Sequence, residues 1–329
     1  MTFLVTGSSG YIGSRLSALI ADRGHAVVGV DREPPSPEET YLDRFVHGDL
    51  CDPAVTENAV KDVDAVLHLA AAKGDWGISE EEYFRDNLEA TEVLLEAGKK
   101  EGIRSWLFYS TVSVLGPSET PLPEDGEFSP IGPYGASKAE AERLFIAYAD
   151  DHPGSEVLTI RPSVVYGPGN PDSTNIYRLV DAIYNRRFMM IGPGEAVKTT
   201  SYIDNLLAAT TFLMDRMQPG LQTFTYVDKP KLTTGQLVED IYQMLGKKPP
   251  STRIPLSIAS PIAKASDVAA WLTGIDFPIT AARIKKFNRS TNFRSETIRE
   301  LGFDQPVDNK TALKETIDWH LRAVYDQIP

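Results

Sequence analysis

The fold of this chain is decided by its first turn, the stretch Phe3-Leu4-Val5-Thr6-Gly7-Ser8-Ser9-Gly10-Tyr11-Ile12-Gly13. Residues 3–6 predict a short buried strand, and residues 12–23 predict a helix that ends at Gly24. The glycines between the two allow a tight turn and a close approach of the backbone to another group. A strand that passes through such a turn into a helix is the first unit of a parallel α/β sheet.

Strands and helices continue to alternate through the first half of the chain. Further strands are predicted at residues 26–31, 44–47, 65–70, 106–110 and 157–162, with helices at 84–100 and 134–148. This order predicts an α/β fold, a Rossmann-type doubly wound parallel sheet with helices on both faces. Ligands of such sheets bind at the carboxyl ends of the strands.

The alternation loosens after residues 167–171. Helices predicted near residues 234–245, 279–287, 295–301 and 310–324 indicate a smaller, mostly helical C-terminal lobe that covers the ligand edge of the sheet. The expected Rossmann domain is residues 1–167 with parts of 195–230. The expected substrate-binding lobe is residues 168–194 and 231–329.

Composition limits the classes of partner. The chain has 329 residues, a formal net charge of −13 and a pI of about 4.9. This acidity argues against nucleic acid or an anionic membrane as a partner, although a local basic pocket can still bind an anionic substrate. No apolar run approaches the roughly eighteen residues of a membrane span, and no signal peptide is visible. The single cysteine, Cys51, forms no internal disulfide, which fits a reducing, cytoplasmic location.

The glycine turn has the context of a dinucleotide-binding loop, although an ordinary turn between strand and helix also contains glycine. The helix after it offers free N–H groups and the positive end of its dipole to a pyrophosphate. Asp31 ends the second strand about twenty residues beyond the loop, where a carboxylate accepts hydrogen bonds from the adenosine ribose. It also repels a 2′-phosphate, which favours NAD over NADP. Arg32 directly after it weakens that preference, because a guanidinium binds phosphate.

Tyr134 and Lys138 lie four residues apart, so a helix places them on one face. An ammonium beside a phenol favours the phenolate and lowers the tyrosine pKa from about 10 toward neutral pH. The tyrosine then becomes a usable general base. Such a pair also arises by chance on solvated helices, but beside a dinucleotide loop it indicates a hydride-transfer site.

Two other segments end predicted strands near the expected cofactor. Asp49 is expected near the adenine amino group with Leu50 against the ring, although a turn aspartate is an equal interpretation. After the fourth strand, the small residues that follow His68 let the backbone approach the cofactor. His68 itself is interpreted as a structural histidine.

These residues resemble the extended short-chain dehydrogenase/reductase family, in its NAD-dependent epimerase/dehydratase branch, over most of the chain. The resemblance implies that Tyr134 is the acid/base, that Thr111 hydrogen-bonds the reacting sugar oxygen and that Lys138 binds the nicotinamide ribose. It implies an NAD site formed by Gly7, Ser9, Gly10, Tyr11, Ile12, Gly13, Asp31, Arg32, Asp49, Leu50, Leu69, Ala70, Ala71, Lys73, Asn87, Ser110, Tyr134, Lys138, Pro162 and Val164. It places substrate contacts at Thr111, Asn175, Lys198 and Arg283.

The chain departs from the family pattern at three places. Dehydratases of this branch carry Asp-Glu directly after the catalytic threonine, whereas this chain has Val112 and Ser113, so a 4,6-dehydratase is not expected. Leu115 replaces a tyrosine that approaches the substrate. Val164 replaces an asparagine that contacts the substrate phosphates, which makes the expected pocket less polar.

The leading hypothesis is a UDP-sugar 4-epimerase, in which Tyr134 assists hydride transfer from C4 to NAD and back to the opposite face. The alternatives are a 4-keto-sugar reductase and a 3β-hydroxysteroid-like alcohol dehydrogenase, the latter motivated by Leu115 and Val164. A binding protein that lost catalysis is a third class, which the intact Thr111 and Lys138 argue against. The five histidines lack ligand spacing, so no metal is expected. The resemblance implies a homodimer.

Overall fold

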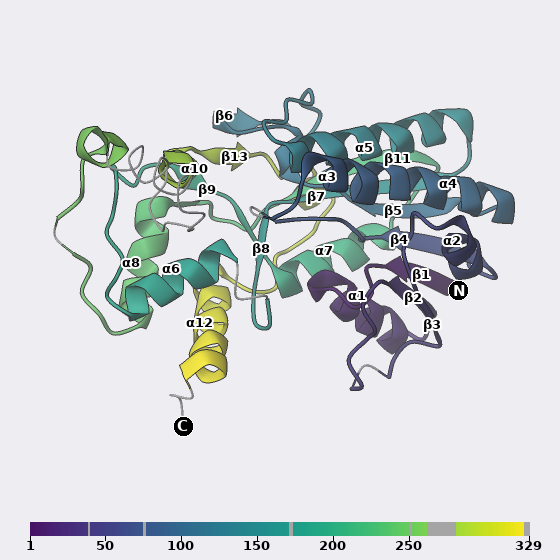
Figure 1. The fold of residues 1–329 in the computed structure, drawn as a ribbon, viewed down its shortest axis with the longest axis horizontal. Coiled ribbons are helices and arrows are strands. Elements are labelled where there is room, and N and C mark those ends of the chain that lie inside the picture. Colours follow the sequence, from purple (N-terminus) through teal and green to yellow (C-terminus); the bar gives the residue numbers. More distant parts are fainter. Residues whose placement is uncertain (39, 75–76, 171–173, 251, 262–280, 326–329) are drawn as a thin grey trace.

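Seven parallel strands form the central sheet in the order β11-β7-β5-β4-β1-β2-β3 (Figure 1). They are β1 (Thr2–Thr6), β2 (Ala26–Asp31), β3 (Arg44–His47), β4 (Ala65–His68), β5 (Ser105–Tyr109), β7 (Glu156–Pro162) and β11 (Gly220–Tyr226). All neighbouring pairs are parallel, and the order reverses between β1 and β4. The predicted doubly wound α/β fold is confirmed in a computed structural model, which describes residues 1–38, 40–74, 77–170, 174–250, 252–261 and 281–325.

Helices cover both faces of this sheet (Figure 1). They are α1 (Tyr11–Asp22), α2 (Pro53–Val60), α3 (Glu80–Phe84), α4 (Ala90–Glu101), α5 (Pro133–Asp151) and α7 (Ile203–Met214). Successive strand residues point to opposite faces. Val5 of β1 therefore packs in one core cluster with Leu16 of α1. Its neighbour Leu4 packs in the other cluster with Leu94 of α4 and Phe145 of α5. Each of these buried side chains contributes about 1.5–3 kcal/mol.

A π-helical turn, η1 (Arg85–Glu89), interrupts the helix predicted at residues 84–100. The helix begins earlier, at α3, because Ser79 and Glu82 form a capping box. The helical chain then continues without a break from α3 through η1 into α4. A π turn adds one residue to a helical turn and occurs often at functional sites. Here it carries Arg85, Asp86 and Asn87.

The C-terminal region is helical, as predicted, and also contains short strands that the sequence did not indicate. Helices among its described residues include α6 (Asn175–Tyr184), α8 (Thr234–Met244), α10 (Ala281–Asn288), α11 (Thr297–Glu300) and α12 (Asn309–Tyr325). The four-stranded sheet β12-β9-β13-β6 is formed by β6 (Ser118–Leu122), β9 (Val197–Lys198), β12 (Leu232–Thr233) and β13 (Thr291–Phe293). A two-stranded pair is formed by β8 (Val164–Tyr166) and β10 (Thr200–Tyr202). The division into two domains stays a prediction.

Candidate active site

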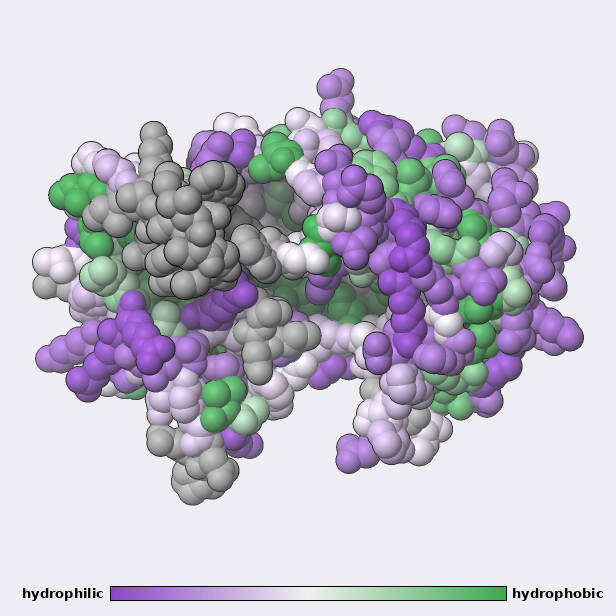
Figure 2. All heavy atoms as spheres, in the orientation of Figure 1, coloured by the Kyte–Doolittle hydropathy of each residue, from purple (hydrophilic) through white to green (hydrophobic). Residues whose placement is uncertain are grey.

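The candidate active site lies along the carboxyl ends of the parallel strands, where the sheet order reverses. Figure 2 shows the surface hollowed between the central sheet and the C-terminal region, with apolar side chains in the hollow. The glycine loop follows β1, Asp31 ends β2, and Thr111 follows β5. Tyr134 and Lys138 lie on α5. The fold thus brings together residues that are more than a hundred positions apart.

The glycine loop has the tight packing that a dinucleotide loop requires. Gly7 has a φ of +68°, and a Cβ on it would lie 2.9 Å from the amide nitrogen of Ala70. A Cβ on Gly13 would lie 2.0 Å from the carbonyl oxygen of Gly7, so only glycine lets α1 pack this closely on the loop. Gly10 caps α1 without a side-chain hydrogen bond. The first N–H groups of α1 therefore remain able to bind a pyrophosphate.

Tyr11 and Ile12, two residues of the predicted dinucleotide loop, also pack against the protein. Tyr11 lies against Arg15, whose guanidinium carbon is 4.3 Å from the ring centroid, and burial raises the pKa of the Tyr11 phenol. Arg15 also donates to the carbonyl oxygen of Pro168 at 2.9 Å, which ties α1 to the loop after β8. Ile12 is half-buried on the same turn. Arg15 therefore joins the helix that follows the glycine loop to the segment that follows β8.

Asp31 lies where the sequence predicts it, half-buried at the end of β2. One carboxylate oxygen accepts from the amide of Ser9 at 3.0 Å, and the other accepts from the amide of Glu33 at 3.1 Å. These bonds fix the carboxylate beside the glycine loop and leave lone pairs on both oxygens for ribose hydroxyls. The residues present thus fit the adenosine half of NAD.

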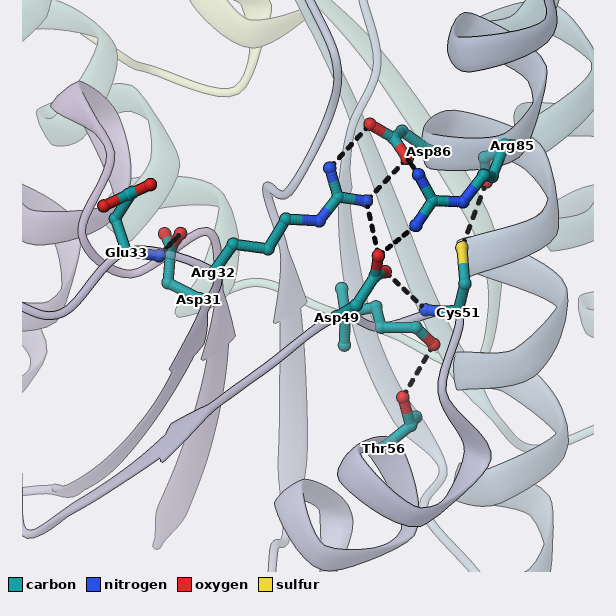
Figure 3. A network of polar contacts seen from close by, with 9 residues as sticks. Asp31, Arg32, Glu33, Asp49, Cys51, Thr56, Arg85 and Asp86 are labelled. Carbon is teal, nitrogen blue, oxygen red and sulfur yellow. Dashed lines mark hydrogen bonds and ion pairs between the residues drawn. The ribbon is translucent and has the colours of Figure 1, made fainter.

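Arg32 does not point toward a ribose phosphate as the sequence suggested. Its guanidinium donates to both carboxylate oxygens of Asp86, at 2.8 and 2.5 Å, and lies 3.0 Å from Asp49 (Figure 3). Arg85 pairs with the same two aspartates. The four side chains form a network that joins the ends of β2 and β3 to the π turn.

Asp49 and Leu50 both have contacts within the protein, and their expected contacts with the adenine stay predictions. Burial alone would raise the pKa of Asp49, but the Cys51 amide and the Arg32 guanidinium hold it below its ordinary value. One oxygen of Asp49 faces the two arginines, and the other accepts from Cys51 at 2.9 Å. Leu50 is only 7% exposed and belongs to the core beneath the sheet.

The chain after β4 approaches the glycine loop through its backbone. The amides of Leu69 and Ala70 both donate to the hydroxyl of Thr6, at 3.1 and 3.0 Å. His68 is fully buried, with its ring nitrogens bonded to the hydroxyls of Thr6 and Thr91. Burial lowers the pKa of His68 to about 3, so it stays neutral and structural. Ala71 and Lys73 follow in the same segment, Lys73 being exposed.

Asn87 of the π turn is fully buried behind this segment. Its amide nitrogen donates to the carbonyl oxygen of Ala72 at 3.1 Å and to the hydroxyl of Ser137 at 2.9 Å. Ser137 lies on α5 between Tyr134 and Lys138 and donates in turn to the carbonyl oxygen of Tyr134. Asn87 therefore ties the catalytic end of α5 to the chain after β4.

The predicted catalytic residues meet at the end of β5. Thr111 caps a short 3-10 turn, accepting from the amide of Ser113 at 3.2 Å, and its hydroxyl acts to lower the pKa of the Tyr134 phenol. Gly135 makes this approach feasible, because a Cβ there would lie 2.8 Å from the carbonyl oxygen of Ser113. Lys138 is 1% exposed, with its ammonium 4.0 Å from the ring centroid of Phe108.

The expected lowering of the Tyr134 pKa by Lys138 is wrong for this structure. Burial raises the pKa of Tyr134 to about 12, and the Thr111 hydroxyl only partly opposes this. Burial also lowers the pKa of Lys138 to about 7, with the Glu142 carboxylate acting in the opposite direction. Both groups are desolvated, which disfavours the charged form of each. The lysine alone is thus a weak source of positive charge for the phenol.

Sequence reasoning missed a buried ion pair beside these residues. Arg161 of β7 donates to Glu142 of α5 at 3.0 and 3.2 Å from its Nε, and the side chains are 6% and 1% exposed. Ser110 donates to the same carboxylate at 2.6 Å, so its hydroxyl is already bonded inside the protein. The sequence signalled only part of it: Glu142 follows Lys138 by four residues on one helix face, but no spacing rule joins Glu142 to Arg161.

The predicted substrate contacts are less defined. Val164 is 38% exposed at the start of β8, two residues after the buried Pro162. Asn175 is exposed at the first position of α6. Lys198 donates to the carbonyl oxygen of Arg289 at 2.6 Å, so its ammonium forms a hydrogen bond within the C-terminal region. Arg283 falls on α10, and its side chain lies outside the described residues.

Two classes of site receive no support from the described ranges. Within them, no group of three or more His, Cys, Asp or Glu side chains is arranged to hold a metal ion. No helix in the described part of the chain has the length and apolar character needed to cross a membrane.

The sequence and the fold both resemble known proteins. The model of the NAD dependent epimerase/dehydratase family matches residues 3–227. The N-acetyl-alpha-D-glucosaminyl-diphospho-ditrans,octacis-undecaprenol 4-epimerase of Escherichia coli O157:H7 is 30% identical over 318 residues, which cover 96% of this chain and 94% of that protein.

A further relative and a solved structure match over most of the chain. The 3 beta-hydroxysteroid dehydrogenase/Delta 5-->4-isomerase of Mycobacterium tuberculosis H37Rv is 30% identical over 347 residues, covering 99% of this chain and 91% of that protein. Among solved structures, MoeE5 in complex with UDP-glucuronic acid and NAD is 27% identical, with a TM-score of 0.77 and coverage of 98% of this chain and 100% of that chain.

Proposed function

The chain belongs to the NAD dependent epimerase/dehydratase family, and we propose on that basis that it is an NAD-dependent 4-epimerase of a UDP-linked sugar. The observation that carries this proposal is the packing of α5, which holds Tyr134 and Lys138 one turn apart, against the 3-10 turn that Thr111 caps at the end of β5. The glycine loop and Asp31 support NAD as the cofactor, as does the NAD bound in the structure of MoeE5.

Each catalytic side chain has a distinct task in this proposal. Tyr134 takes the proton of the C4 hydroxyl through its phenol oxygen and returns it after the sugar has turned. Thr111 donates a hydrogen bond to the same sugar oxygen, exchanging its long bond to Ser113, which measures 3.2 Å. Lys138 binds the nicotinamide ribose.

When bound, NAD⁺ would accept the hydride from C4 of the sugar and would add a positive charge near the phenol. That charge opposes the desolvation that raises the pKa of Tyr134 to about 12. The phenol accordingly loses its proton more readily when NAD⁺ is bound, whereas burial keeps it protonated in the chain alone.

We also propose that dehydration between C5 and C6 is absent. That reaction needs an acid/base pair directly after Thr111, where this chain has a buried valine, Val112, and an exposed serine, Ser113. Neither side chain is a carboxylic acid. A dehydratase reaction would therefore need carboxylates from another segment.

A second candidate is an NAD-dependent dehydrogenase of a hydrophobic alcohol, of the 3β-hydroxysteroid type. The apolar side chains of Val164, exposed at a strand end, and of Leu115, buried beside the 3-10 turn, favour it. The mycobacterial relative favours it as well. A 4-keto-sugar reductase would differ from the 4-epimerase in that hydride is transferred only once, with net turnover of the cofactor.

The remaining expectations are proposals of the same kind. We propose a homodimer that assembles through α4 and α5, as the family resemblance implies, and a role in polysaccharide biosynthesis. The lone thiol of Cys51 is compatible with a cytoplasmic location. Equilibrium sedimentation of the purified chain tests the dimer.

The test of function is incubation of the purified chain with UDP-glucose, UDP-galactose and their N-acetyl and uronic acid forms. Products are followed by NMR while NADH absorbance is recorded, with Tyr134→Phe as the control. Conversion of one C4 epimer into the other without net NADH supports the proposal. Stoichiometric NADH from a sterol alcohol, with no turnover of any UDP-sugar, overturns it in favour of the second candidate.

A further inference from the structure

Arg32 occupies a position from which an arginine would normally decide between NAD and NADP. It follows Asp31 directly, at the end of β2, beside the expected adenosine ribose. A guanidinium there binds a 2′-phosphate bidentately and is the usual means of accepting NADP. The direction of the Arg32 side chain therefore determines how a 2′-phosphate is received.

The structure turns this side chain away from the ribose. Figure 3 shows Arg32 extending away from Asp31 and Glu33, toward Asp86 on the π turn. Both terminal nitrogens of Arg32 donate to Asp86, at 2.8 and 2.5 Å, and one of them also lies 3.0 Å from Asp49. The hydrogen bond with Asp86 raises the pKa of Arg32 above its ordinary value, so the side chain stays charged.

The neighbourhood holds Arg32 in this direction from several elements. The side chain of Asp86 is 13% exposed and that of Asp49 is 27% exposed, so both carboxylates are partly shielded from water. His47 of β3 is hydrogen-bonded through Nε2 to the carbonyl oxygen of Arg32 at 2.7 Å, which fixes the backbone. Arg85 completes a cluster of two arginines and two aspartates, whose formal charges cancel.

We propose that Asp86 is a specificity-determining residue, which makes this site select NAD against NADP by holding the Arg32 guanidinium away from the adenosine ribose. A 2′-phosphate then meets the carboxylate of Asp31 and a cluster without net charge. The inference rests on the proposed NAD site at Asp31, and it assigns the discrimination to two residues that the glycine-loop fingerprint does not contain.

The test is a titration of the purified full chain with NADH and with NADPH, followed by nucleotide fluorescence, for matched variants. Asp86→Asn keeps the shape of the side chain and removes its charge. Glu89→Gln removes the same charge from the same π turn, at an exposed residue that is outside the network. Arg32→Gln is combined with Asp86→Asn to complete a double-mutant cycle, and Asp86→Glu tests rescue.

We expect Asp86→Asn to tighten NADPH binding about tenfold, as one new charge-assisted contact provides, while NADH binding changes less than about threefold. The gain disappears in the double variant with Arg32→Gln, shrinks as salt is added, and is absent in Glu89→Gln and Asp86→Glu. Arg32→Gln alone does not tighten NADPH binding, because it leaves Arg85 as the one arginine against Asp49 and Asp86 and the cluster then carries a net negative charge.

Four results overturn the inference. They are an unchanged ratio of the two affinities in Asp86→Asn, an equal gain in Glu89→Gln, a gain that persists without Arg32, and a gain in the single Arg32→Gln variant, whose exposed position does not threaten folding. Failure of the wild-type chain to bind NADH is a different outcome, because it contradicts the proposed NAD site and not the role of Asp86 alone.

Discussion

Replacing Glu142 by Gln removes the carboxylate that neutralises Arg161 inside the protein. The two side chains are 1% and 6% exposed, and Arg161 also donates to the carbonyl oxygen of Glu124 at 2.6 Å. Removing one partner of such a pair leaves an uncompensated buried charge, which costs about 3–5 kcal/mol. That is a large part of a typical stability of about 5–15 kcal/mol.

The matched control lies on the same helix. Glu140 pairs with Arg143, and these side chains are 45% and 51% exposed. Glu140→Gln makes the same chemical change at the surface, where an ion pair contributes about 0–1 kcal/mol. The two variants thus differ in burial and hardly at all in chemistry or secondary structure.

The assay is urea unfolding of both variants and the wild type, followed by fluorescence and by far-UV circular dichroism to check that one transition is observed. We expect Glu142→Gln to lower the free energy of unfolding by at least about 3 kcal/mol, and Glu140→Gln by less than about 1 kcal/mol. The double change Glu142→Leu with Arg161→Met should recover most of the loss. Equal effects of the two single variants would refute the reasoning.

Three further predictions concern the cofactor and catalytic residues. Tyr134→Phe should lower kcat by roughly 10²–10⁴ while NADH binding measured by fluorescence stays near the wild-type value, because the phenol acts in proton transfer. Gly13→Ala should abolish NADH binding, since its methyl would lie 2.0 Å from the Gly7 carbonyl oxygen, whereas Gly132→Ala, whose methyl meets nothing within 4 Å, should bind normally. Lys138 has a pKa of about 7 in the folded chain against an ordinary 10.5. Its buried ammonium therefore lowers the free energy of unfolding by the full amount below about pH 7, and this loss has disappeared above about pH 10.5. Lys138→Met should therefore unfold at higher urea than the wild type near pH 6, with a difference that shrinks as pH rises; an advantage that grows with pH would contradict this.

Local patterns were sufficient to predict the sheet and the main site positions. The strand-turn-helix pattern around Gly7, the position of Asp31 and the spacing of Tyr134 and Lys138 each depend on local backbone geometry, which sequence expresses directly. The helices of the C-terminal region followed from their apolar periodicity. Most of the assigned binding roles stay predictions, because no ligand contact is described for them.

The parts that the sequence could not supply depend on contacts between distant segments. Arg32 and Asp86 are 54 positions apart, and no spacing rule joins them. The π turn has no sequence signature that helical periodicity detects. The Tyr134 pKa was predicted in the wrong direction because desolvation depends on the whole surrounding structure, whereas the helix spacing describes only the lysine.

The measurement that tests the central claim most directly uses a UDP-sugar carrying deuterium at C4 of the hexose. The chain is incubated with this substrate and catalytic NAD⁺, and the deuterium is located by NMR. If Tyr134 assists a hydride transfer that is reversed within one bound complex, the inverted product keeps its deuterium at C4 and no net NADH forms. Loss of the label to water, or its accumulation in free NADH beside a ketone, would contradict the account.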